Sequence, residues 1–155
     1  MRRCFLFVLF TAACCVCFFP SFAGAEQRGD IILDAEQVIY DQDSGMAESE
    51  GKSSLQQDNV RIFSHRMEYD TVNQHAVATS RPGEVVTLLY GGNRFTGKTL
   101  EYDMDAGEGV LTDATGDLPA GTRGGTVYIR GKNLEVVPLD SALEKKWIKK
   151  RHTRR

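Results

Sequence analysis

Cysteine is missing from most of the sequence. The 155-residue chain has four cysteines, and all of them lie within its first 25 residues: Cys4, Cys14, Cys15 and Cys17. The rest of the chain therefore has no thiol for a disulfide, for a thiolate metal site or for nucleophilic catalysis. Helical spacing of apolar residues is also missing before residue 141, which leaves strands as the expected secondary structure.

The first 25 residues have the layout of a secretory signal peptide. Two arginines follow the initial methionine, residues 4–19 are almost wholly apolar, and residues 21–25 contain the small side chains of a cleavage site. We expect cleavage after Ala25 and export of the remaining chain. The alternatives are cleavage after Ala23, lipidation at Cys14 and retention of the segment as a membrane anchor.

Charge is unevenly distributed along the chain. Residues 26–143 carry 20 acidic and 10 basic side chains, whereas residues 144–155 carry seven lysines and arginines and one glutamate. The acidic body argues against a nucleic-acid-binding domain. The basic tail has two interpretations, a segment that meets phosphates or an anionic membrane surface, and a solvated tail.

Three regions follow from this distribution. We expect a signal peptide at residues 1–25, one domain at residues 26–140 and a basic tail at residues 141–155. The tail begins with a capping-box pattern, Ser141-x-x-Glu144, which predicts a short terminal helix.

A four-residue motif recurs about every thirty residues in the body. Val38-Ile-Tyr-Asp41 is repeated at residues 67–70 and 100–103, and in degenerate form at residues 134–137. Each of the first three copies runs into turn residues, then a strand of small residues, and later a β-branched run. Apolar and polar positions alternate, which predicts strands with one buried face and one solvated face. The sequence therefore predicts an all-β jellyroll, or open roll of stacked antiparallel hairpins, with roughly ten strands.

One stretch matches the P-loop formula letter for letter, Gly92-Asn-Arg-Phe-Thr-Gly97-Lys98-Thr99. The formula binds phosphate only where the lysine opens a helix. Here the alternation of a strand continues through residues 100–103, and the repeat aligns Gly97-Lys98 with Gly131-Lys132. We therefore expect a turn and no nucleotide site.

No other pattern predicts an enzyme, a metal or a cofactor. Asp41-x-Asp43-x-Gly45 and Asp103-x-Asp105-x-Gly107 suggest calcium but lack the glycine and the glutamate that an EF-hand requires at its sixth and twelfth positions. Hairpin turns explain the same residues. No nucleophile elbow is present, and the spacing of the three histidines predicts neither a metal site nor a catalytic triad: His65, His75 and His152.

Three motifs stand in register: Leu33-Asp-Ala-Glu36 with Tyr40-Asp41, Met67-x-Tyr69-Asp70, and Gly97-Lys-x-Leu100-x-Tyr102-Asp103. Together they resemble the OstA-like family, which contains the periplasmic LptA and LptC domains and the N-terminal domain of the outer-membrane LptD protein. The resemblance spans residues 31–137. Two features depart from the family pattern: the first copy has Gly51 and then Val60 in place of Gly-Asn-Val, and the basic tail is not a family feature.

The resemblance implies a periplasmic carrier or bridge for lipopolysaccharide, with no chemistry of its own. Its partners would be homologous domains of the inner- and outer-membrane transport components. Acyl chains would lie between the sheets against inward-facing side chains: Val38, Tyr40, Ile62, Met67, Tyr69, Val86, Leu88, Leu100, Tyr102, Val127 and Ile129. The alternative is an exported β-repeat scaffold that has a packed interior and no lipid ligand.

The ends of such a roll would expose unpaired backbone groups. We expect these edges near Ile31, Leu33 and Ala35 and near Leu134 and Val136, the second ended by a proline that follows it. Edge-to-edge pairing, between copies or onto homologous domains, would extend the interior from one molecule to the next.

Overall fold

The computed structural model describes residues 28–119 and 124–138, and this part of the chain is all-β with antiparallel strands, as predicted. The signal peptide and the helix expected in the tail lie outside the described residues. Ten strands are present in the described ranges: β1 (Ile32–Asp34), β2 (Gln37–Asp41), β3 (Met46–Gln57), β4 (Val60–Asp70), β5 (His75–Thr79), β6 (Val86–Tyr90), β7 (Asn93–Gly97), β8 (Thr99–Asp103), β9 (Glu108–Pro119) and β10 (Thr126–Val136).

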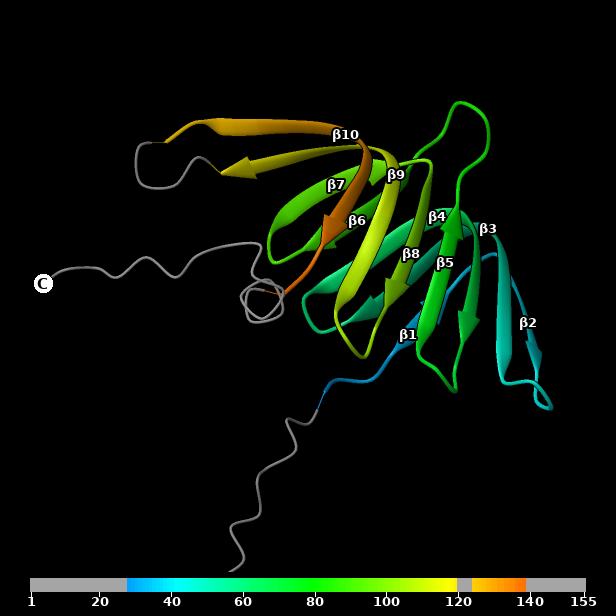
Figure 1. Cartoon of the computed structure of the whole chain (residues 1–155). Coiled ribbons are helices and arrows are strands. Elements are labelled where there is room, and N and C mark those ends of the chain that lie inside the picture. Colours follow the sequence, from blue (N-terminus) through cyan, green and yellow to red (C-terminus); the bar gives the residue numbers. More distant parts are fainter. Residues whose placement is uncertain (1–27, 120–123, 139–155) are drawn as a thin grey trace, which may run out of the picture.

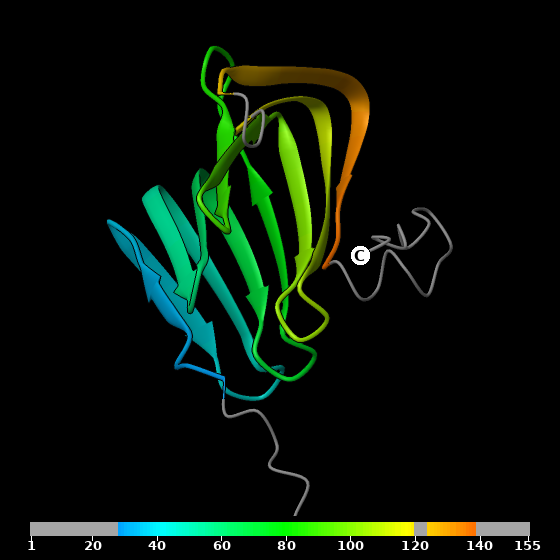
Figure 2. The same cartoon turned by 90° about the vertical axis from the view of Figure 1, so that its left-hand side faces the viewer.

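Three long strands, β3, β4 and β9, change partners along their length and so belong to two half-sheets (Figure 1). The fourth long strand, β10, follows β9 through both half-sheets. Half-sheet A has the order β2-β3-β4-β5-β8-β9-β10, and half-sheet B has the order β1-β3-β4-β6-β7-β9-β10. The two half-sheets fold over one another around a shared core. Figure 2 shows that β1 and β2 lie at one end of this roll and β10 at the other.

The change of partners coincides with local irregularities of the long strands. The register of β3 against β4 shifts between Glu50 and Ser53, which is the signature of a β-bulge, and bulges bend strands. Gly51 lies inside this bulge with a φ of 90°, and a Cβ atom there would stand 2.7 Å from the Cβ of Glu36. Glycine is therefore required at the bend, both for its backbone conformation and for the close approach.

Half-sheet A is an alternation of two kinds of strand. The strands that carry the four-residue motif are β2, β4, β8 and β10, and each is separated from the next by a strand of small residues, β3, β5 or β9. The partners across the strands form two interior rows. The first row is Val38, Ser49, Met67, Ala78, Leu100, Leu111 and Leu134, and the second is Tyr40, Ala47, Tyr69, Ala76, Tyr102, Gly109 and Val136.

Half-sheet B has bulkier side chains on its interior face. Its central row is Leu33, Leu55, Ile62, Leu88, Phe95, Gly116 and Ile129. The buried hydrophobic members of all three rows belong to one hydrophobic core. The repeat motifs and the β-branched runs of the sequence therefore face each other across that core.

The motif aspartates cap the turns at the end of half-sheet A. The Oδ1 of Asp41 accepts a hydrogen bond from the amide of Asp43 at 2.9 Å, and Asp103 accepts one from Ala106 at 2.7 Å. Asp70 accepts hydrogen bonds from two backbone amides and from the side chain of Asn73. These turn bonds account for Asp41 and Asp103, the first aspartate of each pattern that the sequence spaces like calcium ligands.

Candidate functional site

Seven of the eleven residues predicted to line the interior are buried in the shared core. Each of them is at most 5% exposed: Ile62, Met67, Tyr69, Val86, Leu88, Leu100 and Tyr102. At these positions the half-sheets pack directly on one another, so the interior is filled with side chains rather than open. A bound acyl chain would have to separate side chains that are now in contact.

The other four predicted lining residues lie at the ends of the roll. Val38 and Tyr40 are 46% and 53% exposed on β2, and Val127 is 46% exposed on β10, while Ile129 is half-buried. Their cross-strand partners, such as Ala47 and Leu118, belong to or pack on the core, so all four side chains are on the interior face. These four side chains are less enclosed than the other seven, because they belong to edge strands that no further strand of the described chain covers.

A cleft of about 510 Å³ opens beside β1. Its floor contains apolar side chains from both half-sheets, and its rim is polar. The lining residues are Arg28, Gly29, Asp30, Ile31, Leu33, Ala47, Gln57, Tyr69, Thr71 and Gln74. Tyr40 lies next to this cleft, because it is the direct cross-strand partner of Ala47.

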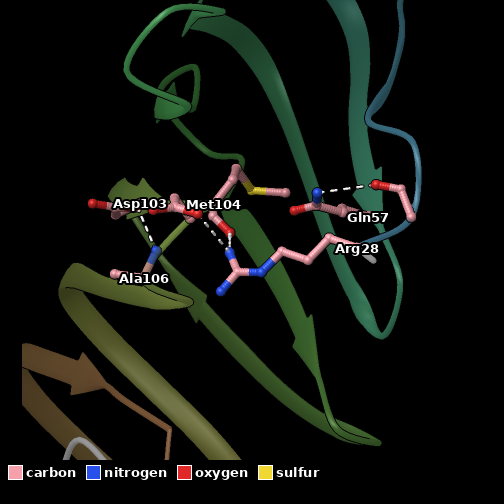
Figure 3. A network of polar contacts seen from close by, with 7 residues as sticks. Arg28, Gln57, Asp103, Met104 and Ala106 are labelled. Carbon is pink, nitrogen blue, oxygen red and sulfur yellow. Dashed lines mark hydrogen bonds and ion pairs between the residues drawn. The ribbon is translucent and has the colours of Figure 1, made fainter. Parts of the chain in front are cut away.

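A polar network connects the chain just before β1 to both half-sheets (Figure 3). Arg28 donates a hydrogen bond from Nη1 to the carbonyl oxygen of Met104 at 2.8 Å and pairs with Asp105 at 3.3 Å. On the other side, Gln57 donates to the carbonyl oxygen of Gly29 at 3.1 Å. Sequence reasoning did not single out Arg28 or Gln57, because neither belongs to a repeat and their partners are distant in the sequence.

Tyr102 places a hydroxyl group in the core beside this network. Its side chain is 1% exposed, and its oxygen has no hydrogen-bond partner among the described residues. Burial, and to a smaller extent the neighbouring Tyr90, raise the pKa of this hydroxyl far above its ordinary value. The hydroxyl therefore stays protonated and can donate a hydrogen bond to a ligand or a water molecule.

A second cleft, of about 600 Å³, lies on the outside of the roll at its bend. It combines the exposed apolar side chains of Phe63 and Val85 with polar ones, including His65, whose Nε2 is buried without a partner in the described part of the chain. No motif of the sequence pointed to this cleft. Its residues come from β3, β4 and the loop before β6.

The predicted edges are located where the roll ends, but their extent differs from expectation. At the N-terminal end β1 has three residues, and Leu33 pairs with Leu55 of β3. The second strand of this end, β2, was not expected to be an edge. At the other end β10 begins at Thr126 rather than near Leu134, and it ends two residues before Pro138.

Exposed apolar side chains gather at these two ends. Of the ten large hydrophobic residues that are exposed in the described chain, six lie on edge strands: Ile32, Val38, Ile39, Tyr40, Val127 and Tyr128. Val38, Tyr40 and Val127 lie on the interior face, so this face carries exposed apolar side chains at both ends of the roll, and the other three lie on the outer face. Such exposed apolar surface is typical of an interaction site.

The lysine of the P-loop-like stretch has a structural partner. Lys98 is the single residue between β7 and β8, so it opens no helix, as predicted. Its Nζ pairs with Asp113 at 2.6 Å, and this pairing raises the pKa of Lys98 and lowers that of Asp113. Both side chains are more than half exposed, which limits the strength of the pair.

The comparisons with known proteins reach only the level of a remote structural likeness. The sequence matches no model of a protein family and no curated protein. Among similar solved structures is that of LptH, the LptA-homologous periplasmic component of the lipopolysaccharide transport device from Pseudomonas aeruginosa. It matches with a TM-score of 0.49 and 14% sequence identity over 69% of this chain and 75% of that chain. A likeness this remote does not carry function from one chain to the other.

Within the described ranges, the chain contains no helix whose length and apolar character would let it cross a membrane.

Proposed function

We propose that this chain is a periplasmic lipopolysaccharide-binding protein that carries or bridges its lipid toward the outer membrane, without chemistry of its own. One observation carries the proposal. Interior rows of apolar side chains run through the roll from β2 to β10, and the interior face carries exposed apolar residues at both ends, Val38 and Tyr40 on β2 and Val127 on β10. The repeated motifs that build these rows are the ones that resemble the OstA-like family.

The physical need for such rows is the cost of exposing acyl chains to water. Each exposed CH₂ group costs about 0.8 kcal/mol, so a lipid with several chains needs cover along its whole path. In half-sheet A the small residues of β5, Ala76 and Ala78, lie between the large ones of β4 and β8. An acyl chain that displaced the facing side chains of half-sheet B would find a groove along β5.

Edge pairing is the second part of the proposal. The edges formed by β1, β2 and β10 are open to another strand, and the apolar side chains on them would be covered by head-to-tail pairing. The partner would be a second copy or a homologous domain of a membrane component. The interior rows of one molecule would then continue into the next.

The competing function is that of an exported scaffold with no lipid ligand. The packed core favours it, because seven of the proposed lining residues are already buried by protein. The two functions differ in whether the half-sheets separate to admit a lipid.

Site-specific photo-crosslinking to lipopolysaccharide distinguishes them. Tyr40 and Ile39 are adjacent on β2 and similarly exposed, at 53% and 60%, but they point to opposite faces. A photoreactive phenylalanine at Tyr40 should crosslink to lipopolysaccharide, and the same group at Ile39 should not. In the core, Tyr69 and its neighbour Glu68 form the second matched pair: the photoreactive group should crosslink to lipopolysaccharide at Tyr69 and should not at Glu68. Crosslinks at Tyr40 but not at Tyr69 would indicate lipid at the mouth only, and equal labelling of all four positions would contradict the proposal.

The edges are tested by Leu33→Pro, with Leu33→Ala as the control that keeps the backbone amide. Proline in β1 should weaken self-association or docking onto a homologous domain, because it disrupts the strand that would pair. The remaining roll should still fold, since β1 contributes only three residues. Light scattering and pull-down measure assembly, and circular dichroism measures folding. Undiminished assembly of a folded Leu33→Pro variant would show that this edge is not the joint.

A further inference from the structure

We infer that residues 28–31 form a displaceable strap across a lateral entrance to the interior, and that the hydrogen bonds of Arg28 and Gly29 hold it closed. The inference rests on the proposed function, because the entrance would admit an acyl chain. It adds a route by which lipid enters, since the acyl chain would pass through the side of the roll, between the turns, rather than only through the ends.

The entrance is the gap between the turns of the two half-sheets, opposite the bends of the long strands. At the end of half-sheet A the turns are hydrogen-bonded to one another, from Thr71 to Gly45 and from Met104 to Gln74. The end of half-sheet B faces them. Residues from both ends line one small cavity of about 140 Å³, including Asn59 and Tyr90 from half-sheet B and Tyr102 from half-sheet A.

The strap crosses this gap and is attached on both sides (Figure 3). On the side of half-sheet B, the amide of Gly29 donates to Oδ1 of Asp58 at 3.1 Å, and its carbonyl oxygen accepts from Gln57 at 3.1 Å. On the side of half-sheet A, the strap is held by the Arg28 guanidinium, which contacts Met104 at 2.8 Å and Asp105 at 3.3 Å. We call Arg28 the latch, because its guanidinium attaches the strap to half-sheet A.

Arg28 and Gln57 also separate two spaces. Both residues line the cleft of about 510 Å³ beside β1, and both line the small cavity beside Tyr102. Removing the strap would join these spaces into one opening. The joined opening would reach from the surface to the apolar side chains of Leu33 and Tyr69 and to the unpartnered hydroxyl of Tyr102. That hydroxyl would meet the ester or amide carbonyl at the head of an acyl chain.

The strap has the features of a segment that opens locally. Residues 28–30 are exposed, and the strand that follows them, β1, pairs at three positions with β3 alone. Segments with few buried contacts and exposed hydrogen bonds open at low free-energy cost, without unfolding the remaining structure.

A disulfide that fixes the strap to half-sheet B is the direct test. A Cβ atom on Gly29 would lie 3.4 Å from Cγ of Asp58, so Gly29→Cys and Asp58→Cys should form a bond. The four native cysteines are replaced by alanine in every variant, and the exported protein is purified from cells that express the full chain. The control pair is Thr99→Cys with Thr112→Cys, on the outer face, where the two hydroxyl oxygens are 2.6 Å apart.

The readouts are stopped-flow association with a fluorescent long-chain fatty acid and binding of purified lipopolysaccharide. With the strap disulfide oxidised, association should be at least about tenfold slower, and reduction should restore it, whereas the control pair should behave alike in both states. Residue 58 has a positive φ of 48°, so its substitution can introduce backbone strain. The reduced form carries the same substitutions and therefore controls for any effect of this strain on association. Equal association in the oxidised and reduced states would overturn the inference while leaving the proposed function intact.

Release of the latch is the opposite test. Arg28→Ala should speed association about tenfold, as expected for the loss of one hydrogen bond to a charged group, and Arg94→Ala, on the outer face of β7, should not. Unchanged association of Arg28→Ala would also overturn the inference. Failure of the unsubstituted protein to bind either probe would instead reject the proposed function, and the entrance with it.

Discussion

Half-sheet A and half-sheet B share four strands, yet they differ in regularity and in charge. Half-sheet A is periodic, with motif strands and small-residue strands in strict alternation. Its outer face carries a cross-strand row with four glutamates, and its turns carry the motif aspartates: Glu48, Glu68, Glu101 and Glu135, with Asp41, Asp70 and Asp103. Half-sheet B has no such repeat.

This difference gives the two half-sheets interior faces of different shape. The small strands of half-sheet A leave grooves between ridges of large side chains, and the buried hydrophobic residues of both half-sheets form one core. The interior face of half-sheet A therefore has a shape that suits elongated apolar groups. The side chains of half-sheet B would have to be displaced to admit such a group.

The largest expected effect on stability comes from exchanging a large and a small side chain on the interior face of half-sheet A. Ala78 and Leu100 are direct cross-strand partners, and both are 0% exposed. We expect Leu100→Ala to cost about 2–5 kcal/mol of unfolding free energy through the cavity it leaves. We expect Ala78→Leu to cost about 1–3 kcal/mol through overpacking.

The double variant sharpens this comparison. It restores the total volume of the pair, so it should be more stable than the sum of the two single effects predicts, by about 0.5–3 kcal/mol. Urea unfolding of all four proteins measures this coupling. Strict additivity would show that the alternation of half-sheet A does not matter for how it packs on half-sheet B.

An intermediate effect is expected in acid, at the turns of half-sheet A. Hydrogen bonds from Asn73, first from its backbone amide and then from its side chain, hold the pKa of Asp70 below its ordinary value of 3.8. Because the folded state favours the ionised carboxylate, this stabilisation is present above the ordinary pKa and is lost as pH falls through the folded value. Asp41 behaves in the same way, through Ser44 first and then Asp43.

The measurement is the thermal midpoint as a function of pH. Asp70→Asn should flatten the decline of the midpoint between about pH 5 and pH 2, because asparagine does not titrate. An unchanged slope in Asp70→Asn would contradict a role for this turn carboxylate.

The smallest effect is expected on the acidic face itself. Arg66 pairs with Glu48 at 3.4 Å and with Glu68 at 3.1 Å, and all three side chains are about half exposed. Arg66→Ala should cost at most about 1 kcal/mol, and the difference should shrink in high salt as the charges are screened. Urea unfolding at low and high ionic strength measures it. A cost that is the same at both ionic strengths would mean that packing of the arginine stem, rather than its charge, is responsible.

The sequence by itself determined the strand faces and the turns, which depend on residues close to one another in the chain. Alternation within each motif predicts which of Tyr69 and Glu68 faces the core, because successive side chains of a strand point to opposite faces. The aspartate that ends each motif predicts a turn, because its short side chain bonds to amides two and three residues on. Ten strands, their antiparallel pairing and seven buried interior residues follow from these local rules.

Only the tertiary structure decided which strands end the roll and where the long strands bend. Val38 belongs to the same interior row as Met67, yet it is exposed, because β2 has a single neighbour and the motif itself does not reveal this. Arg28 reaches Met104 across 76 positions of the sequence, and no local pattern announces such a contact. Pairing between distant segments decides these features, and its free energy depends on the whole arrangement of strands rather than on any one of them.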